Sequence, residues 1–271
     1  MKQLKFLMVA FTLLMGVSFT SCLNDDAGES MYDGIGYVRT VMGSYFVDLY
    51  GNTYHPTMAS VTEMEGFKMS GTDLAQIAFK YVEDTPATKA EGSTFTPQDY
   101  RIKLVSAIAV DSYSTKHVSS VENMEMEAIP ETAPIVTLEP TDNYGQTYKP
   151  WMYGAEMLVL PISWKMENNK EEMLKQHTME LVYINDESNE SSTELVFYLR
   201  HNKGTDTKTD VFAVRNKAYD VKQIMSDFKG KHGSYPTTIR IKAKTDMDGA
   251  KLPEKYTDYT IENFKWNPSN Q

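Results

Sequence analysis

The sequence predicts an all-β protein with two β-rich domains, and three observations lead to this prediction. Short runs of alternating apolar and polar residues, broken by Gly, Asn and Pro, recur along most of the chain. The second half holds about seven such runs separated by turn residues, which is typical of an immunoglobulin-like β-sandwich. The 271 residues, 41% of them hydrophobic, suffice for one large or two small folded domains.

Residues 1–21 have the features of a bacterial lipoprotein signal peptide. Lys2 and Lys5 precede the apolar run 6–15, which is too short to span about 30 Å of hydrocarbon but matches the apolar part of a signal peptide. Thr20 and Ser21 directly before Cys22 resemble a lipobox, in which the thiol receives a diacylglyceryl group and becomes the new N-terminus. We therefore expect lipidation at Cys22. The alternative is an ordinary signal peptide with an incidental cysteine.

Residues 22–32 form an acidic tether that resembles the surface-export signal of Bacteroidetes lipoproteins, although a plain solubilising linker would have the same composition. We expect the chain to be held at the outer membrane by its N-terminal lipid, with palmitate-type acyl chains, and to be exposed at the cell surface. Loss of two lysines with the signal peptide changes the net charge from -10 to (27 − 2) − 37 = -12. Such a charge argues against a nucleic-acid partner, because phosphates require a cationic surface.

The first β-rich domain is predicted over residues 33–115. It opens with a meander of three short strands, and a long alternating run follows in its second half. The segment 74–82 fits a helix or a strand, but its Ile, Phe, Tyr and Val favour a strand. Residues 83–97 are rich in Thr, Pro, Gly and Ala, which indicates an exposed loop. The expected strands are residues 35–41, 45–50, 53–56 and 100–110.

A cluster of Ser and Thr at residues 112–120, followed by glutamates, indicates a connection between the domains, which is predicted over residues 116–134. The β-sandwich domain is predicted over residues 135–271. Residues 222–228 are compatible with one helical turn before Gly230. Strands are expected at residues 135–138, 157–166, 177–184, 194–201, 211–221, 237–244 and 256–265.

Several motifs together resemble the NigD-like lipoproteins of Bacteroidetes. They are the lipobox, the acidic tether, the Tyr-rich meander, the Trp151-x-x-Gly154 start of a strand and the strand that ends in Arg200-His201-Asn202. This resemblance implies an OB-like barrel for residues 33–115, a β-sandwich for residues 135–271, and a strand at 74–82. It also makes a bacteriocin-related role an expectation. The chain departs from the family where Thr205 separates Gly204 from Asp206.

Sequence motifs for catalysis or metal binding are not found. Cys22 is used by the anchor, and neither a Gly-x-Ser-x-Gly elbow nor a paired-histidine zinc motif occurs. Residues 246–249 begin like a calcium loop, but Ala250 and Lys251 occupy positions that need an oxygen ligand and a glycine, so a β-turn is expected. We expect no cofactor and no metal. Each histidine is expected to be a surface or hydrogen-bonding residue: His55, His117, His177, His201 and His232.

Two groups of residues are candidates for ligand binding. Arg200 and Asn202 fall on one face of a predicted strand, where they could hold a carboxylate or sugar hydroxyls, but fixing the strand end and the turn at Gly204 is the favoured alternative. Four aromatic rings in one loop could stack against sugars, while packing of the loop onto the sandwich is the more ordinary explanation. These aromatic residues are Tyr144, Tyr148, Trp151 and Tyr153.

The sequence therefore predicts a non-enzymatic, lipid-anchored envelope protein that binds an unidentified envelope protein, peptide or glycan. The alternative is a glycan-binding accessory lipoprotein of a nutrient-uptake system, in which the aromatic loop would be the binding surface. A hydrolase is not supported, because no set of acid, base and nucleophile can be recognised in the sequence.

Overall fold

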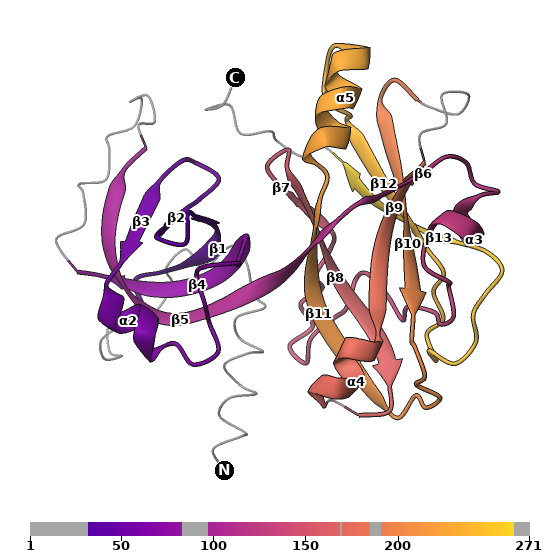
Figure 1. The fold of residues 1–271 in the computed structure, drawn as a ribbon, viewed down its shortest axis with the longest axis horizontal. Helices are drawn as coiled ribbons and strands as arrows, with labels where there is room; N and C mark the ends of the chain where they lie inside the picture. The colour runs from indigo at the N-terminus through magenta and orange to yellow at the C-terminus, as the bar shows by residue number, and fades with distance from the viewer. Residues whose placement is uncertain (1–31, 83–96, 169, 185–190, 263–271) are drawn as a thin grey trace. The chain divides into compact units, whose positions relative to one another are not determined.

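The computed structural model describes residues 32–82, 97–168, 170–184 and 191–262. The chain divides into two compact units, with the boundary between Asp111 and Ser112. Among the described residues, unit 1 precedes this boundary and unit 2 follows it, and the strand β5 (Asp99–Ser114) runs across it. The elements are labelled in Figure 1. The expected signal peptide, Cys22, the tether up to residue 31 and most of the predicted loop at 83–97 lie outside the described residues.

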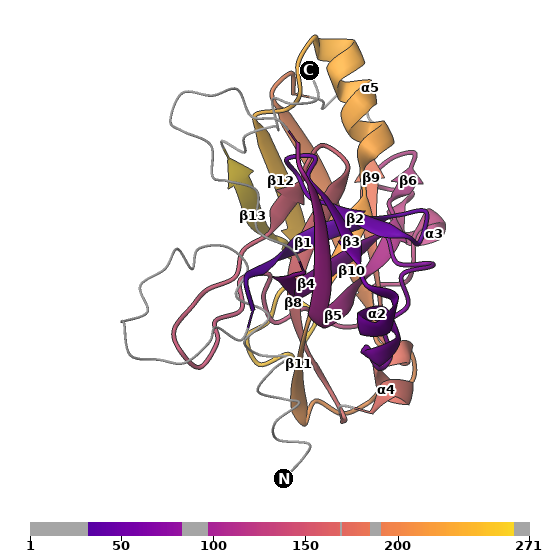
Figure 2. The same ribbon diagram turned by 90° about the vertical axis from the view of Figure 1, so that its left-hand side faces the viewer.

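Unit 1 is a five-stranded barrel with one short helix. Its strands follow the order β3-β2-β1-β4-β5, and β3 also pairs with β5, so the sheet closes on itself. This closed meander is the predicted OB-like barrel, and its strands can be followed from two sides in Figures 1 and 2. The elements are β1 (Gly34–Val41), β2 (Tyr45–Val47), β3 (Thr53–Pro56), α2 (Met58–Glu63), β4 (Leu74–Tyr81) and β5 (Asp99–Ser114).

The alternation of side chains along the strands builds the barrel core. Ile77 and Phe79 of β4 and Ile102 and Leu104 of β5 are buried in one cluster, as period-two alternation requires. The segment that the sequence left open between helix and strand is the strand β4. Its first six residues are all buried, which explains why its apolar residues do not follow a clean alternation.

Gly34 provides room for an aromatic ring of this core. A Cβ atom at Gly34 would lie 2.5 Å from Cζ of Phe79, whose ring is held between Tyr54 and Tyr81 at centroid distances of 5.2 and 5.3 Å. We expect Gly34→Ala to lower the free energy of unfolding by about 2 kcal/mol through overpacking. Calorimetric unfolding is the suitable measurement, because the sequence of unit 1 contains no tryptophan.

Gly36 offers a matched control on the same strand. A Cβ atom there meets no heavy atom within 4 Å in the described part of the chain. Gly36→Ala should therefore leave stability unchanged or raise it by about 0.5 kcal/mol, through the reduced freedom of the unfolded chain. Equal losses from the two substitutions would contradict the role assigned to the Phe79 ring.

Unit 2 is a sandwich of two sheets. One sheet has the order β11-β8-β7 and the other has the order β13-β12-β10-β9-β6. The predicted all-β class, a barrel followed by a β-sandwich, is confirmed. β10 runs parallel to β12 and β6 parallel to β9, which differs from the all-antiparallel immunoglobulin arrangement. The strands are β6 (Lys116–Val118), β7 (Trp151–Tyr153), β8 (Met157–Met166), β9 (Thr178–Ile184), β10 (Glu194–Asn202), β11 (Val211–Asp220), β12 (Thr238–Ala243) and β13 (Thr257–Glu262).

The core of unit 2 lies between these sheets. Trp164 of β8 and Phe197 of β10 belong to one buried cluster, and helix α5 (Lys222–His232) closes it with Ile224 and Phe228. Figure 1 shows α5 at one end of the sandwich and α4 (Glu171–Gln176) at the other. The sequence predicted one turn up to residue 228, but the helix continues through Gly230 to His232. Gly233 caps it, with a φ of 80° that suits a glycine at a helix C-terminus.

Two predicted segments differ from the structure. Residues 135–138 form isolated bridges, Ile135 with Thr245 and Thr137 with Ser163, instead of a regular strand. Residues 116–134, expected to connect the domains, belong to unit 2: they contain β6 and α3 (Met124–Glu127). Met124 is buried there with Val118 and with Val182 of β9, so this stretch packs as part of the sandwich. Residues 119–134 are called the strap below.

Candidate functional site

The polar residues of unit 2 meet where β10 ends and turns toward β11. The strand ends in Arg200-His201-Asn202, and the turn continues through Gly204 to Asp206. Arg200, His201 and Asp206 are exposed by 0, 1 and 2% of their surface, although buried charged residues are unusual unless they are paired. The partners of these groups therefore define what the site can do.

Arg200 binds the strap with its whole guanidinium group. Its Nη1 and Nη2 donate to the two carboxylate oxygens of Glu125 at 2.9 and 2.8 Å, and its Nε donates to the carbonyl oxygen of Ile129 at 2.8 Å. The hydrogen bonds from Arg200 hold the pKa of Glu125 below its usual value. This bidentate geometry is one that arginine forms especially well. Arg200, which the sequence made a candidate for binding a ligand carboxylate, here binds a carboxylate of the chain itself.

Further contacts hold the strap along the same sheet. The amide of Ile129 donates to Glu180 on β9 at 2.8 Å, and the amide of Thr132 donates to the carbonyl oxygen of His201 at 3.0 Å. Near its end, Glu131 lies 3.1 Å from Nζ of Lys244, and burial raises the pKa of this glutamate. The polar residues that made this stretch resemble a linker are the groups that attach it.

Asn202 shapes the turn that follows β10. Its Oδ1 accepts a hydrogen bond from the amide of Gly204 at 2.8 Å and a weaker one from the hydroxyl of Thr132 at 3.4 Å. Gly204 has a φ of 58°, and a Cβ atom there would lie 3.1 Å from the carbonyl oxygen of Gln176. The contacts of Asn202 agree with the alternative in which it fixes the strand end and the Gly204 turn.

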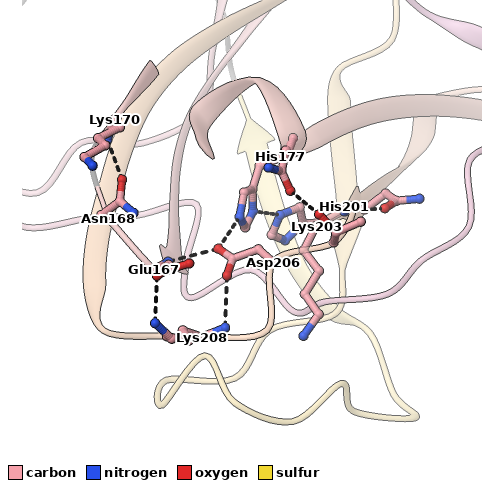
Figure 3. Close-up of polar contacts among 12 residues, drawn as sticks. Glu167, Asn168, Lys170, His177, His201, Lys203, Asp206 and Lys208 are labelled. Carbon is pink, nitrogen blue, oxygen red and sulfur yellow. Dashed lines mark hydrogen bonds and ion pairs between the residues drawn. The ribbon is translucent and has the colours of Figure 1, made fainter. Parts of the chain in front are cut away.

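A chain of buried imidazoles crosses the end of the sandwich (Figure 3). Nδ1 of His177 lies 2.9 Å from Nε2 of His201, and Nε2 of His177 lies 2.9 Å from Oδ2 of Asp206. At the other end, Nδ1 of His201 lies 3.0 Å from the carbonyl oxygen of Pro134 in the strap. The chain thus joins the residue between α4 and β9, the end of β10, the following turn and the strap.

Asp206 is the anionic end of this chain. It also accepts hydrogen bonds from the amides of Glu167 and Lys208, both at 2.9 Å. Burial alone would raise its pKa, but the hydrogen bonds from Lys208, His177 and Glu167 lower it below the usual value. Asp206 is therefore ionised at neutral pH.

The aromatic candidates do not form one platform. Tyr144 is 73% exposed in a turn, whereas Tyr153 on β7 is only 4% exposed. The hydroxyl of Tyr148 donates to Asp142 at 2.9 Å, and Trp151 packs edge to face with Tyr153 at a centroid distance of 6.1 Å. Of these four residues the structure brings Trp151 and Tyr153 into mutual contact, on the strand that carries them.

The residues described by the structure contain no group of three histidine, cysteine or acidic side chains placed to hold a metal ion. At the predicted turn near Asp246, one carboxylate oxygen accepts hydrogen bonds from the amides of Ala250 and Lys251, both at 2.9 Å. The acidic start of this segment thus caps its own backbone.

Solved structures provide the relevant comparison, since no family model and no curated protein matches the chain in sequence. A candidate lipoprotein from Bacteroides fragilis NCTC 9343 aligns with a TM-score of 0.62 and 23% identity, over 84% of this chain and 96% of its own. A protein of unknown function from Bacteroides vulgatus ATCC 8482 aligns with a TM-score of 0.53 and 10% identity, over 88% and 93%. The chain shares their fold.

A NigD-like immunity protein from Bacteroides caccae ATCC 43185 aligns less closely, with a TM-score of 0.46 and 12% identity over 88% of this chain and 100% of its own. Neither of the two proteins that share the fold is named as an enzyme. Among the helices that the structure describes, none has the length and apolar character needed to cross a membrane.

The sequence did not predict the partners of the Arg200-His201-Asn202 motif. Each histidine was assessed separately, so the pairing of His177 with His201 was not predicted, and Asp206 was noted only for its altered spacing. Glu125 and Glu131 were assigned to a linker. The sequence signal that could have found them is the position of Arg200 and His201 directly after the apolar run 195–199, because buried charges need partners elsewhere in the chain.

Proposed function

We propose that this protein is a lipid-anchored envelope protein of the NigD-like type, which acts by binding a partner and not by catalysis. One observation carries this proposal: the polar side chains at the end of β10 are buried and form hydrogen bonds with other groups of the same chain. These residues are Arg200, His177, His201 and Asp206. A catalytic site needs acid, base or nucleophilic groups that a substrate can reach. These four residues instead stabilise the strap and the turn after β10.

The anchor is part of the same proposal. The basic start, the short apolar run and Cys22 after Thr20-Ser21 support lipidation, and the fold shared with a candidate lipoprotein agrees with it. We place the lipidated chain at the outer membrane, with its two units on the cell surface. Its acidic composition would not attract anionic headgroups, so attachment depends on the acyl chains.

The proposed partner is an envelope protein or a peptide. The glycan alternative would need several accessible rings, but Tyr153 is buried and the Tyr148 hydroxyl already donates to Asp142. Calorimetric titration with a panel of polysaccharides, repeated with Trp151→Ala, tests this choice. We expect no saturable heat from either chain. Saturable binding that Trp151→Ala abolishes would instead establish the glycan alternative.

Cys22→Ser tests the anchor. Without a thiol the diacylglyceryl group cannot be attached, so the variant should leave the membrane fraction and lose labelling by lipid precursors. Membrane fractionation and metabolic labelling measure the two effects. A Cys22→Ser chain that stays in the membrane fraction would contradict lipid anchoring. Surface exposure is tested separately, by protease accessibility of the wild-type chain on intact cells.

Partner binding is tested by cross-linking on intact cells, followed by recovery of the anchored chain. We expect one envelope protein or peptide to be recovered with it, and the purified partner to bind the mature chain saturably in solution. Turnover of a cell-envelope substrate by the purified chain, lost on substitution of His177, would contradict the non-enzymatic proposal.

A further inference from the structure

The buried imidazole chain of unit 2 contains a proton that two neutral histidines cannot supply. Its three contacts, at 3.0, 2.9 and 2.9 Å, are all within hydrogen-bonding distance. The two contacts made by His177 can be seen in Figure 3. One end is the carbonyl oxygen of Pro134, and the other is the Asp206 carboxylate. A carbonyl oxygen and an ionised carboxylate only accept hydrogen bonds, so every proton in the chain must come from the rings.

The number of these protons determines the protonation state of the two rings. Three hydrogen bonds need three N–H groups, whereas two neutral imidazoles carry one each. With only two protons, one of the three contacts lacks its hydrogen. Either two nitrogen lone pairs face each other between the rings, or, if Nε2 of His201 donates to His177, the Nδ1 lone pair of His201 faces the carbonyl oxygen of Pro134. The observed separations, 2.9 Å between the rings and 3.0 Å to Pro134, are both those of hydrogen bonds and together require the third proton.

We propose that the His177–His201 pair binds one extra proton between its rings and acts as a pH-sensitive latch. When this proton is present, the latch is closed: the contact between the rings ties His177, which precedes β9 and is bonded to the turn after β10, to His201 at the end of β10 and through it to the strap. When the proton is lost, the contact between the two rings opens, while each ring keeps its bond to Asp206 or to Pro134.

The surroundings assign the extra proton to His177. Burial, together with the charges of His177, Lys217 and Lys203, lowers the pKa of His201 to about 3, so this ring stays neutral. His177 is the ring beside Asp206, whose carboxylate stabilises a cation there. Lys208 pairs with Glu167 at 2.7 Å, and Nζ of Lys217 donates to the hydroxyl of Tyr113 at 2.8 Å. The charge of Lys203 lowers the pKa of both histidines.

The pKa of His177 sets the direction of the pH effect. Burial lowers this pKa from its usual value, and the Asp206 hydrogen bond and charge oppose the decrease. In the unfolded chain, a histidine has a pKa of about 6.5. The folded chain has the lower pKa at His177, so the unfolded chain binds this proton more tightly. The stability that comes from a neutral His177 is therefore complete above about pH 6.5 and is lost as the pH falls through the folded pKa. The latch closes over the same interval.

Nitrogen NMR of the mature chain, labelled with ¹⁵N-histidine and titrated between pH 4 and 8, tests the proposal directly. At acidic pH we expect protons on both nitrogens of His177 and on Nδ1 of His201. As the pH rises, Nδ1 of His177 should lose its proton in one step while the other two remain. Protonation of Nε2 of His201, or no change at any of these four nitrogens, would overturn the proposal.

Two variants provide a second test. His177→Gln should reduce the loss of unfolding free energy between pH 7 and 5, whereas His117→Gln, on the exposed edge strand β6, should keep the wild-type dependence. Asp206→Asn should move the NMR step to a pH about one unit lower, because the neighbouring negative charge is removed. The same pH dependence in wild type and His177→Gln would also overturn the latch.

Discussion

Arg200→Met is expected to lower the free energy of unfolding of unit 2 by about 3 kcal/mol, since it removes three charge-assisted hydrogen bonds from a buried position. The carbonyl oxygen of Ile129 would lose its donor, and Glu125 would lose both of its bonds to the guanidinium. Methionine replaces much of the apolar stem, so the loss reports mainly on the polar contacts. Denaturant unfolding followed by tryptophan fluorescence measures it, because all three tryptophans of the sequence fall in unit 2.

Arg240 is the matched control for this substitution. It lies on β12 of the same sheet and also binds carboxylates, Glu194 at 2.6 Å and Asp258 at 2.7 Å, but its side chain is 35% exposed. Part of the Arg240 side chain stays in contact with water, whereas the Arg200 side chain is fully buried, so Arg240→Met should cost less than about 1 kcal/mol. Hydrogen exchange should also accelerate at the amides of Ile129 and Thr132 in Arg200→Met and not in Arg240→Met. Equal effects of both substitutions would show that Arg200 does not hold the strap.

The parts of the fold that follow from local sequence patterns were predictable. β8 occupies residues 157–166, as expected, because a continuous apolar run of this length matches a strand buried on both faces. β4 was ambiguous for the same physical reason: its first six residues are all buried, so helical and strand periodicities fit equally well. Helix α5 was predicted too short, because Gly230 suggested an end that the helix passes through.

The candidate site could be predicted only in part, because it depends on contacts between distant residues. Arg200 and Glu125 are separated by 75 positions, and His177 and Asp206 by 29. A segment rich in serine, threonine and glutamate is typical of a linker when its neighbours are unknown. The strap departs from that expectation because Arg200 and Glu180 on the sheet, and Lys244 directly after β12, provide partners for it. The motif residues were recognised, whereas their partners required the three-dimensional fold.

Trp164→Ala is expected to have the largest effect on unit 2, a loss of about 4 kcal/mol, since the truncation leaves a large cavity in the core. Trp164 is 1% exposed, and its ring lies 6.2 Å from the ring of His177 and 6.4 Å from that of His201. Water that enters such a cavity would also stabilise a charged imidazole. The proton of the latch should therefore be bound more tightly, and its NMR step should move to higher pH.

Trp164→Phe separates packing from the polar properties of this residue. The Nε1 atom of Trp164 is buried without a hydrogen-bond partner among the described residues, so phenylalanine removes an unsatisfied donor while keeping an aromatic ring beside the two histidines. Removal of the unsatisfied donor should offset part of the stability that is lost with the smaller side-chain volume. The free energy of unfolding should therefore fall by only about 1 kcal/mol. The measurements are denaturant unfolding by far-ultraviolet circular dichroism and the histidine titration. Equal destabilisation of unit 2 by Trp164→Phe and Trp164→Ala would contradict this account. It would mean that Nε1 of Trp164 is hydrogen-bonded in solution, and that an aromatic ring beside the two histidines is not sufficient for stability.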